Sequence, residues 1–151
     1  MKLMLRELFE TESLIRQFEC DVQMDDRHLP AGFSLSKPIS LKGEATNRAG
    51  VVVINYRAVA LFDLVCDRCL TEFERVFEYD FSHTLVRSLN SDKDSDEYIV
   101  CENDTLDLND LAISDLLLTL PTKILCRDDC KGLCPVCGGN LNDGSCECSD
   151  R

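Results

Sequence analysis

Apolar and polar residues alternate along the first part of the chain. Between residues 13 and 24 (SLIRQFECDVQM) every second position from Phe18 onward is apolar, and the positions between are Gln, Glu or Asp. Such period-two alternation is typical of a strand with one buried face. We therefore predict a strand here, and we expect Cys20, on the apolar side, to act as a small buried hydrophobic residue.

The middle of the chain has the pattern of an antiparallel sheet. The segment PISLKGEA (38–45) leads to a turn candidate, NRAG (47–50), and then to VVVINYRAVALFDLVC (51–66), in which every even position from Val52 to Leu64 is apolar. Beyond Cys69 the alternation returns with opposite parity. We predict two strands joined by a hairpin whose tip is CDRC (66–69), on the surface rather than in the core. The apolar side of the second strand consists of Phe73, Phe77, Tyr79 and Phe81, and its acidic side of Glu72, Glu74, Glu78 and Asp80.

Helical spacing follows in the segment DTLDLNDLAISDLLLTLP (104–121). Apolar residues recur at intervals of three and four, which is typical of a helix with one buried face. We predict a helix near residues 107–120, capped by Asp107 or Thr105, ended by Pro121 and packed on the sheet. Before it, the acidic segment that begins at Ser88 favours a mobile surface loop, and Cys101, in a short apolar run, is expected in the core. The apolar residues of the helix are Leu108, Leu111, Ala112, Leu116, Leu117 and Leu120.

Composition and charge limit the classes of function. A length of 151 residues suits one domain, or one domain with a small appendage, and 44% hydrophobic residues are ordinary for a soluble globular protein. The net charge is -12, from 28 acidic against 16 basic residues. The basic residues are scattered, so a broad basic face for RNA is not expected, and the acidity leaves direct RNA contact undecided. No apolar run approaches the ~20 residues that span a bilayer, and charges interrupt the first residues, so we expect a cytoplasmic protein with no membrane partner.

Ten cysteines carry the chemistry of the sequence. In a reducing compartment they indicate metal or redox roles rather than disulfides. The segment GLCPVCGG holds two thiols in a turn with Pro135 and two glycines, and NLNDGSCEC provides a second turn that brings two more cysteines back. This spacing suits tetrahedral sulfur ligation of zinc. The first zinc site is therefore predicted from Cys134, Cys137, Cys146 and Cys148.

Four further cysteines leave two arrangements open. In the first, the hairpin pair and the two cysteines that begin the tail form a second four-cysteine zinc site, which would hold the C-terminal segment against the hairpin tip. In the second, one site recruits Cys130 beside Cys134, Cys137 and Cys148, and the hairpin pair stays free. The number of zinc ions per chain, one or two, separates the arrangements. The second site of the first arrangement would consist of Cys66, Cys69, Cys126 and Cys130.

The hairpin pair also permits a redox hypothesis. Cys66 and Cys69 have the dithiol spacing of disulfide oxidoreductases, and Arg68 between them would lower a thiol pKa. Those enzymes place the motif at a helix N-terminus, whereas here an alternating strand follows it. Neither His28 nor His83 lies in a recognisable motif, and no GxSxG, P-loop, GxGxxG or HExxH occurs. We predict that the chain is not an enzyme and has no small-molecule substrate.

The order of these motifs resembles the YceD-like family, also called the large ribosomal RNA subunit accumulation proteins. The hairpin motif CDRCL, the acidic stretch, the helix ending LLLTLP and the tail LCRDDCKGLCPVCGGNLNDGSCEC carry the resemblance, from about residue 10 to residue 148. The resemblance implies a cytosolic, non-enzymatic factor linked to maturation or accumulation of large-subunit (23S) ribosomal RNA. Its partner would be a ribosomal protein or a large-subunit precursor ribonucleoprotein. The matching residues are Cys66, Cys69, Leu70, Leu120, Pro121, Cys130, Gly132, Leu133, Cys134, Pro135, Cys137, Gly138, Asn140, Leu141, Asn142, Cys146 and Cys148.

Taken together, we predict an α+β fold: an antiparallel sheet, with barrel-like closure as one option, a leucine-rich helix and a small C-terminal zinc-binding module. We divide the chain into a β-rich core domain, residues 1–125, and a cysteine-rich zinc-binding tail, residues 126–151. The leading function is a non-catalytic zinc-binding factor in ribosome biogenesis. The alternatives are a thiol-disulfide redox protein or sensor that uses Cys66 and Cys69, and a generic zinc-stabilised protein–protein adaptor.

Overall fold

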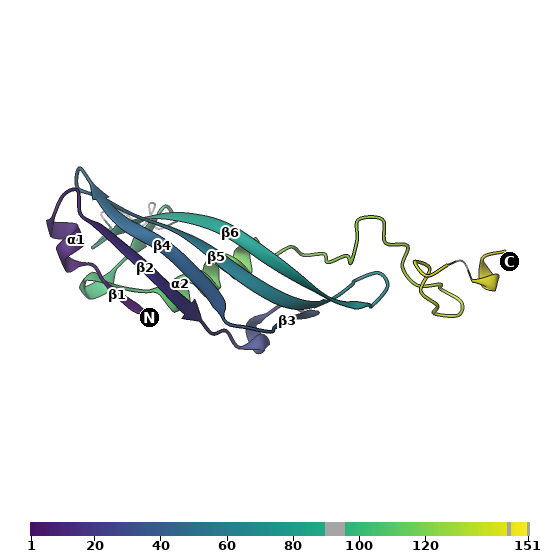
Figure 1. Cartoon of the computed structure of the whole chain (residues 1–151). Coiled ribbons are helices and arrows are strands. Elements are labelled where there is room, and N and C mark those ends of the chain that lie inside the picture. Colours follow the sequence, from purple (N-terminus) through teal and green to yellow (C-terminus); the bar gives the residue numbers. More distant parts are fainter. Residues whose placement is uncertain (90–95, 145, 151) are drawn as a thin grey trace.

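A long antiparallel sheet forms most of the molecule (Figure 1). The computed structural model describes residues 1–89, 96–144 and 146–150. The sheet has the strand order β2-β4-β5-β6-β7, with the short β3 paired to β5, and only the β6–β7 pairing is parallel. In chain order the elements are β1 (Lys2–Met4), α1 (Arg6–Glu10), β2 (Ile15–Val22), the 3₁₀ turn η1 (Asp26–His28), β3 (Phe33–Leu35), β4 (Ile39–Arg48), β5 (Val51–Val65), β6 (Glu72–Val86), β7 (Tyr98–Val100), η3 (Glu102–Asp104), β8 (Thr105–Asp107), α2 (Leu108–Thr119) and η4 (Glu147–Asp150).

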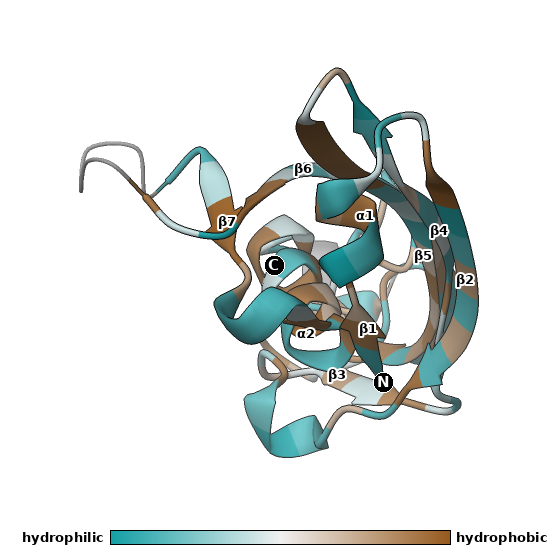
Figure 2. Ribbon diagram, turned by 90° about the vertical axis from the view of Figure 1, so that its left-hand side faces the viewer, coloured by the Kyte–Doolittle hydropathy of each residue, from teal (hydrophilic) through white to brown (hydrophobic). Residues whose placement is uncertain are grey.

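The sheet curls into a half-barrel around α2 (Figure 2). Its concave side carries the residues that alternate in β5, and every even position from Val52 to Leu64 is buried, as the period predicts. The fold is therefore α+β, as predicted; β2, β5 and β6 confirm the three predicted strands, and β4 lies in the segment that has the pattern of an antiparallel sheet. The predicted turn before β5 is also present, with the positive φ angles of 54° at Ala49 and 86° at Gly50.

One row of residues across four strands allows the sheet to bend. The register aligns Phe18, Gly43, Tyr56 and Phe81 on neighbouring strands. Because Gly43 has no side chain, the rings of Phe18 and Tyr56 approach to 6.5 Å between centroids across β4. A Cβ atom at Gly43 would lie 2.2 Å from the Asn55 carbonyl oxygen, so β4 and β5 could not come this close with any other residue there.

The helix α2 closes the concave side of the sheet. Asp107 caps it by accepting a hydrogen bond from the Asn109 backbone N–H at 2.9 Å, so Asp107, and not Thr105, is the cap. Its buried residues are spaced by four, and Pro121 follows the end, as predicted. Leu118, in contrast, is 87% exposed and faces away from the core. The core residues of the helix and of the residue after it are Leu108, Ala112, Leu116 and Leu120.

The N-terminal segment completes this core, which the sequence pattern did not predict. The strand β1 pairs with β8, and Leu5 donates its N–H to the Asp104 carbonyl at 2.8 Å. Leu3, Leu5 and Leu8 are buried there, from β1 through α1. The two elements are too short for their period to be visible in the sequence.

Of the two isolated cysteines, Cys101 is a core residue as expected, whereas Cys20 is less buried than expected. Cys101 is 1% exposed, and Cys20 is half-buried against the core.

The acidic segment predicted as a surface loop contains residues 90–95, which lie outside the described residues. Within the part of the chain that is described, no helix is long and apolar enough to cross a membrane.

A polar network ties α2 to the sheet. Asp115 of α2 accepts a hydrogen bond from the Tyr56 hydroxyl and lies 2.6 Å from His83 Nε2. Tyr56 is 4% exposed, and its burial together with the Asp115 carboxylate raises its pKa well above the ordinary value. His83, which lies in no sequence motif, therefore has a defined partner that comes from a helix 32 residues away.

Candidate metal centres

The tip of the β5–β6 hairpin is a tight turn that holds two cysteines. The Cys66 carbonyl accepts a hydrogen bond from the Leu70 N–H at 3.0 Å, and the Cys66 N–H donates to the Thr71 carbonyl at 2.9 Å. Leu70 completes the turn with a φ of 60°. Cys66 and Cys69 thus lie within one turn, as the sequence predicted for CDRC.

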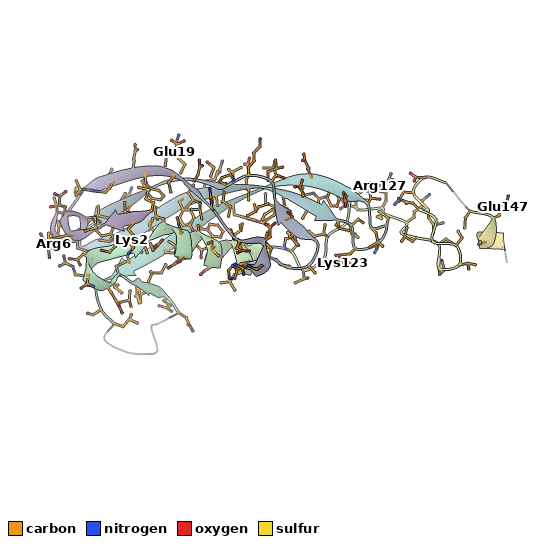
Figure 3. The ribbon with its side chains drawn as sticks, turned by 90° about the horizontal axis from the view of Figure 1, so that it is seen from below. Lys2, Arg6, Glu19, Lys123, Arg127 and Glu147 are labelled. Carbon is orange, nitrogen blue, oxygen red and sulfur yellow. The ribbon has the colours of Figure 1, made fainter. Side chains whose placement is uncertain are left out.

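The chain that follows α2 returns to this tip. Asp67 forms two hydrogen bonds with Ile124: the Asp67 N–H donates to the Ile124 carbonyl at 2.8 Å, and the Asp67 carboxylate accepts the Ile124 N–H at 2.6 Å. Arg75 donates to the Leu125 carbonyl and Arg68 to the Cys130 carbonyl, both at 2.9 Å. These contacts place the start of the tail against the hairpin. In Figure 3 Lys123 and Arg127 lie beside the hairpin tip, and Glu147 lies at the far end of the tail.

Four sulfur atoms converge where tail and hairpin meet; we call this group the hairpin centre. It consists of Cys66, Cys69, Cys126 and Cys130, whose Sγ atoms all lie within 4.8 Å of one another. The Sγ atoms of Cys66 and Cys130 are 3.6 Å apart, as are those of Cys69 and Cys126. Four sulfurs at about 2.3 Å from a zinc ion would be about 3.8 Å apart at the edges of a tetrahedron, so the observed spacing fits this metal. All four are free thiols.

The burial of this centre corrects one expectation. The hairpin tip was predicted on the surface, and Asp67, Arg68 and Leu70 are exposed there, but its two cysteines are not, since Cys66 is 0% and Cys69 4% exposed. The tail covers them, and Cys130, at 3% exposure, contributes to the cover. A sequence pattern within the hairpin carries no information on a segment that returns from residue 124 onward.

Hydrogen-bond donors surround the sulfurs of the hairpin centre. The N–H of Cys126 points at Cys66 Sγ at 3.3 Å, and the side-chain amide of Asn142 at Cys130 Sγ, also at 3.3 Å. Burial raises the pKa of Cys66, but backbone N–H groups of Cys69, Cys126 and Arg68 outweigh it, so that the pKa falls to about 6. Donors of this kind stabilise thiolates, which are the form that binds metal.

A second group of four sulfurs lies further along the tail; we call it the tail centre. It consists of Cys134, Cys137, Cys146 and Cys148, whose Sγ atoms also lie within 4.8 Å of one another. The CPVCG turn is closed by the Gly138 N–H, which donates to the Cys134 carbonyl at 2.9 Å, and by the Cys134 N–H, which donates to Gly139 at 2.8 Å. Gly138 has a φ of 74°, a conformation that favours glycine.

Acidities in the tail centre follow the same pattern. The backbone N–H groups of Cys137 and Val136, together with the Cys146 thiol, lower the pKa of Cys134 to about 6. Burial and the neighbouring thiols raise the pKa of Cys148 to about 11, and burial likewise raises that of Cys126 in the hairpin centre to about 12. Four thiolates without a cation would repel one another. All four cysteines of a centre would therefore be deprotonated together only around a metal ion.

Side chains of the tail connect the two centres. Asn142, between Cys137 and Cys146 in sequence, accepts the Lys131 N–H at 2.9 Å while its amide reaches Cys130. Asn140 accepts the Asn142 N–H at 3.0 Å and donates to Thr71 of the hairpin at 3.2 Å. The loop of the tail centre therefore contacts the sulfur shell of the hairpin centre. Neither asparagine was singled out as a site residue from composition or spacing.

The geometry also bears on the redox hypothesis. Cys66 and Cys69 each have a cysteine of the tail at 3.6 Å between Sγ atoms, and both are buried. The motif precedes a strand and not a helix, so no helix dipole is available to stabilise one thiolate of the pair. The arrangement favours four-sulfur ligation over exchange with an external disulfide.

The structure combines a curled half-barrel with two four-cysteine centres, which defines a class of small, cysteine-rich proteins. The sulfur positions in both centres are compatible with binding of a metal such as zinc. The chain belongs to the YceD family: the family model described as "Large ribosomal RNA subunit accumulation protein YceD" matches residues 54–151. The matched region begins within β5 and includes both centres.

Two curated proteins are similar to the chain. The uncharacterized protein YlbN of Bacillus subtilis is 23% identical over 130 residues, which is 85% of this chain and 76% of YlbN. The uncharacterized protein ML1660 of Mycobacterium leprae is 33% identical over 84 residues, which is 50% of this chain and 36% of that protein. No solved structure matches the chain.

Proposed function

We propose that the chain is a non-catalytic, zinc-binding factor in ribosome biogenesis that supports accumulation or processing of large-subunit (23S) ribosomal RNA in the cytoplasm. Its membership of the YceD family carries this proposal, because the family description names large ribosomal RNA subunit accumulation. The two four-cysteine centres support the metal-binding part.

Each centre would hold one zinc ion. Cys66, Cys69, Cys126 and Cys130 would bind the first, and the four cysteines of the tail centre the second. A site closed by four thiolates has no position for a reactive water, so zinc would act as a cross-link and not as a Lewis acid. In the hairpin centre this cross-link would fix the chain after α2 to the tip of the sheet. The division into a core domain, residues 1–125, and a tail, residues 126–151, would then describe two parts joined by a shared metal site.

The partner would be a ribosomal protein or a large-subunit precursor ribonucleoprotein. The net charge of -12 supports contact through protein, because clustered basic residues are what gives affinity for a phosphate backbone. Enrichment of large-subunit precursors with the tagged chain would support this function, whereas enrichment of unrelated proteins alone would indicate a generic adaptor.

Depletion of the protein tests the proposal. We expect mature large-subunit RNA to fall relative to small-subunit RNA, and the wild-type gene to restore the ratio. A variant without the tail centre, Cys134→Ser with Cys137→Ser, is compared with Cys20→Ser, which changes a thiol outside both centres. Depletion that leaves the ratio of the two RNAs unchanged would contradict the proposed function.

A further inference from the structure

Among the described residues, the outer edge of β6 has no partner strand over most of its length. Among the described residues β7 pairs with β6 only from Thr84 to Val86, and the stretch from Glu72 to His83 pairs with β5 on its inner edge alone. Unpaired N–H and C=O groups in a row of this length are a template for a further strand. Edge addition of an extended peptide is a known mode of recognition, in which the backbone supplies affinity and alternate side chains supply specificity.

The concave face of this edge is apolar from Phe77 to Phe81 and incompletely covered, while Arg75, which the register places on the same face, lies over the Phe73 ring. Phe73, Phe77, Tyr79 and Phe81 are all only half-buried, although they pack on the core. Tyr79 lies between two aromatic neighbours, with ring centroids 6.0 Å from Phe77 and 6.1 Å from Phe81. The other edge strand, β2, differs, because its Phe18 and Val22 are buried. An added strand at β6 would therefore cover aromatic surface that no described residue covers.

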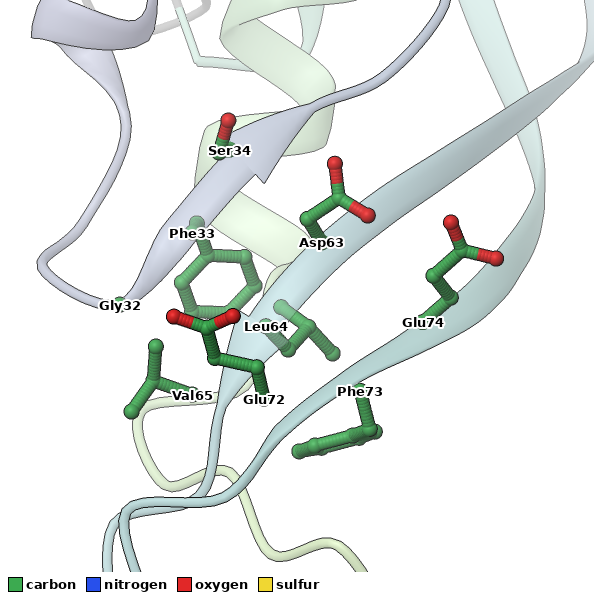
Figure 4. Close-up of a pocket in the computed structure, with 9 residues that line it drawn as sticks. All are labelled: Gly32, Phe33, Ser34, Asp63, Leu64, Val65, Glu72, Phe73 and Glu74. Atoms are coloured by element: carbon green, nitrogen blue, oxygen red, sulfur yellow. The ribbon is translucent and has the colours of Figure 1, made fainter.

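The convex face of the same edge is acidic. Glu72, Glu74 and Glu78 are exposed, and none forms an ion pair among the described residues. Glu74 also lies directly opposite Asp63 of β5, and like charges in this position are destabilising. Figure 4 shows the carboxylates of Asp63, Glu72 and Glu74 around a hollow between β3, β5 and β6. A cationic side chain beside Glu74 would relieve this repulsion.

We infer that the outer edge of β6 binds an extended, basic segment of a protein partner as an added strand. The aliphatic side chains of that segment pack on Phe77, Tyr79 and Phe81, and its lysine or arginine side chains face Glu74 and Glu78. A second copy of this chain does not fit, because its own β6 edge would bring the same carboxylates together. The inference goes beyond the proposed function, since it concerns the sheet edge and requires neither metal nor RNA.

A designed peptide tests the edge directly. The probe is a capped peptide of about ten residues that alternates valine and lysine, and the control peptide has proline in place of valine, with equal charge but alternate N–H groups removed. We expect the zinc-loaded full chain to bind the valine peptide and not the proline peptide in fluorescence anisotropy. Amide hydrogen exchange should slow between residues 72 and 83 and stay unchanged in β2.

Charge variants test the contacts of the convex face. The double variant Glu74→Lys with Glu78→Lys is expected to weaken binding about tenfold, whereas Glu12→Lys with Glu102→Lys, with the same change of net charge outside residues 72–83, keeps the affinity within about twofold. Equal losses in both variants, equal binding of the proline peptide, or protection at β2 in place of β6 would overturn the inference. A free chain that sediments as a dimer and whose β6 edge is protected in hydrogen exchange would also overturn the inference. The assay contains no ribosomal component, so its failure is distinguishable from failure of the proposed function.

Discussion

Single side chains decide how the two centres are connected. Asn142 has both ends of its amide engaged, with the Lys131 N–H and with Cys130 Sγ. A donor beside a metal-bound thiolate stabilises its charge without being a ligand. Asn142 is therefore the residue through which the loop of the tail centre acts on the hairpin centre.

We predict that Asn142→Ala weakens zinc binding at the hairpin centre about tenfold, because the Cys130 thiolate loses a donor and the Lys131 N–H loses its acceptor. Competition with a chromophoric zinc chelator measures the affinity. Asn55→Ala, at an exposed position of β5, serves as the control and should leave the affinity unchanged. Equal affinity of the Asn142 variant and the wild type would refute this role.

Residue-level chemistry was predictable where it is local in sequence. CPVCG forms the expected turn, and the two pairs Cys66–Cys69 and Cys126–Cys130 lie together as one of the two arrangements proposed. Asn142, Asp67 and Arg68 could not be assigned in this way, because their roles depend on the chain after α2 meeting the hairpin tip. The spacing of residues within a motif does not predict that the chain after α2 contacts the hairpin tip.

At the scale of elements, burial and hydrogen bonding fix α2 on the sheet. Alternation in β2, β5 and β6 and the four-residue spacing in α2 were sufficient to predict these elements. The short pairs β1–β8 and β6–β7 were not predictable, because three residues cannot show a period. The contact of Asp115 with Tyr56 and His83 likewise arises only when the helix packs into the curled sheet.

The Tyr56–Asp115 contact predicts a pH dependence. The folded-state pKa of Tyr56 lies above its ordinary value of 10.0, because burial and the Asp115 carboxylate disfavour the phenolate. Above pH ~10 the unfolded chain releases this proton and the folded chain keeps it, so stability is present below that pH and is lost as the pH rises.

Urea unfolding from pH 9 to about 11.5 checks this expectation. Stability should fall by up to about 1.4 kcal/mol per pH unit through this group, and Tyr56→Phe should make the fall less steep. The control Tyr98→Phe, which removes a hydroxyl from β7, should retain the wild-type slope. An identical slope in the Tyr56 variant and the wild type would show that this residue does not titrate as described.

At the scale of the whole molecule, the two parts of the chain differ in what stabilises them. The sheet and α2 share one apolar core, whereas the tail has few apolar residues and is organised around sulfur. Figure 1 shows the tail continuing past the hairpin tip, away from the half-barrel. The hairpin centre is the place where the two parts are joined.

Metal removal should therefore act unevenly. We predict that a strong chelator increases amide hydrogen exchange in the tail from residue 126 onward and at the hairpin tip, residues 66–71, while β4 and the middle of β5 keep their protection. Mass spectrometry of exchanged peptides with and without chelator measures this difference. Uniform protection in both samples would mean that metal does not organise the tail.

The number of zinc ions per chain tests the central claim most directly. Native mass spectrometry of the reduced, purified protein should give two zinc ions for the wild type and for Cys20→Ser, and one for Cys66→Ser, which removes a ligand of the hairpin centre only. A single zinc ion in the wild type, or a metal-free chain whose tail keeps its amide protection, would contradict the account.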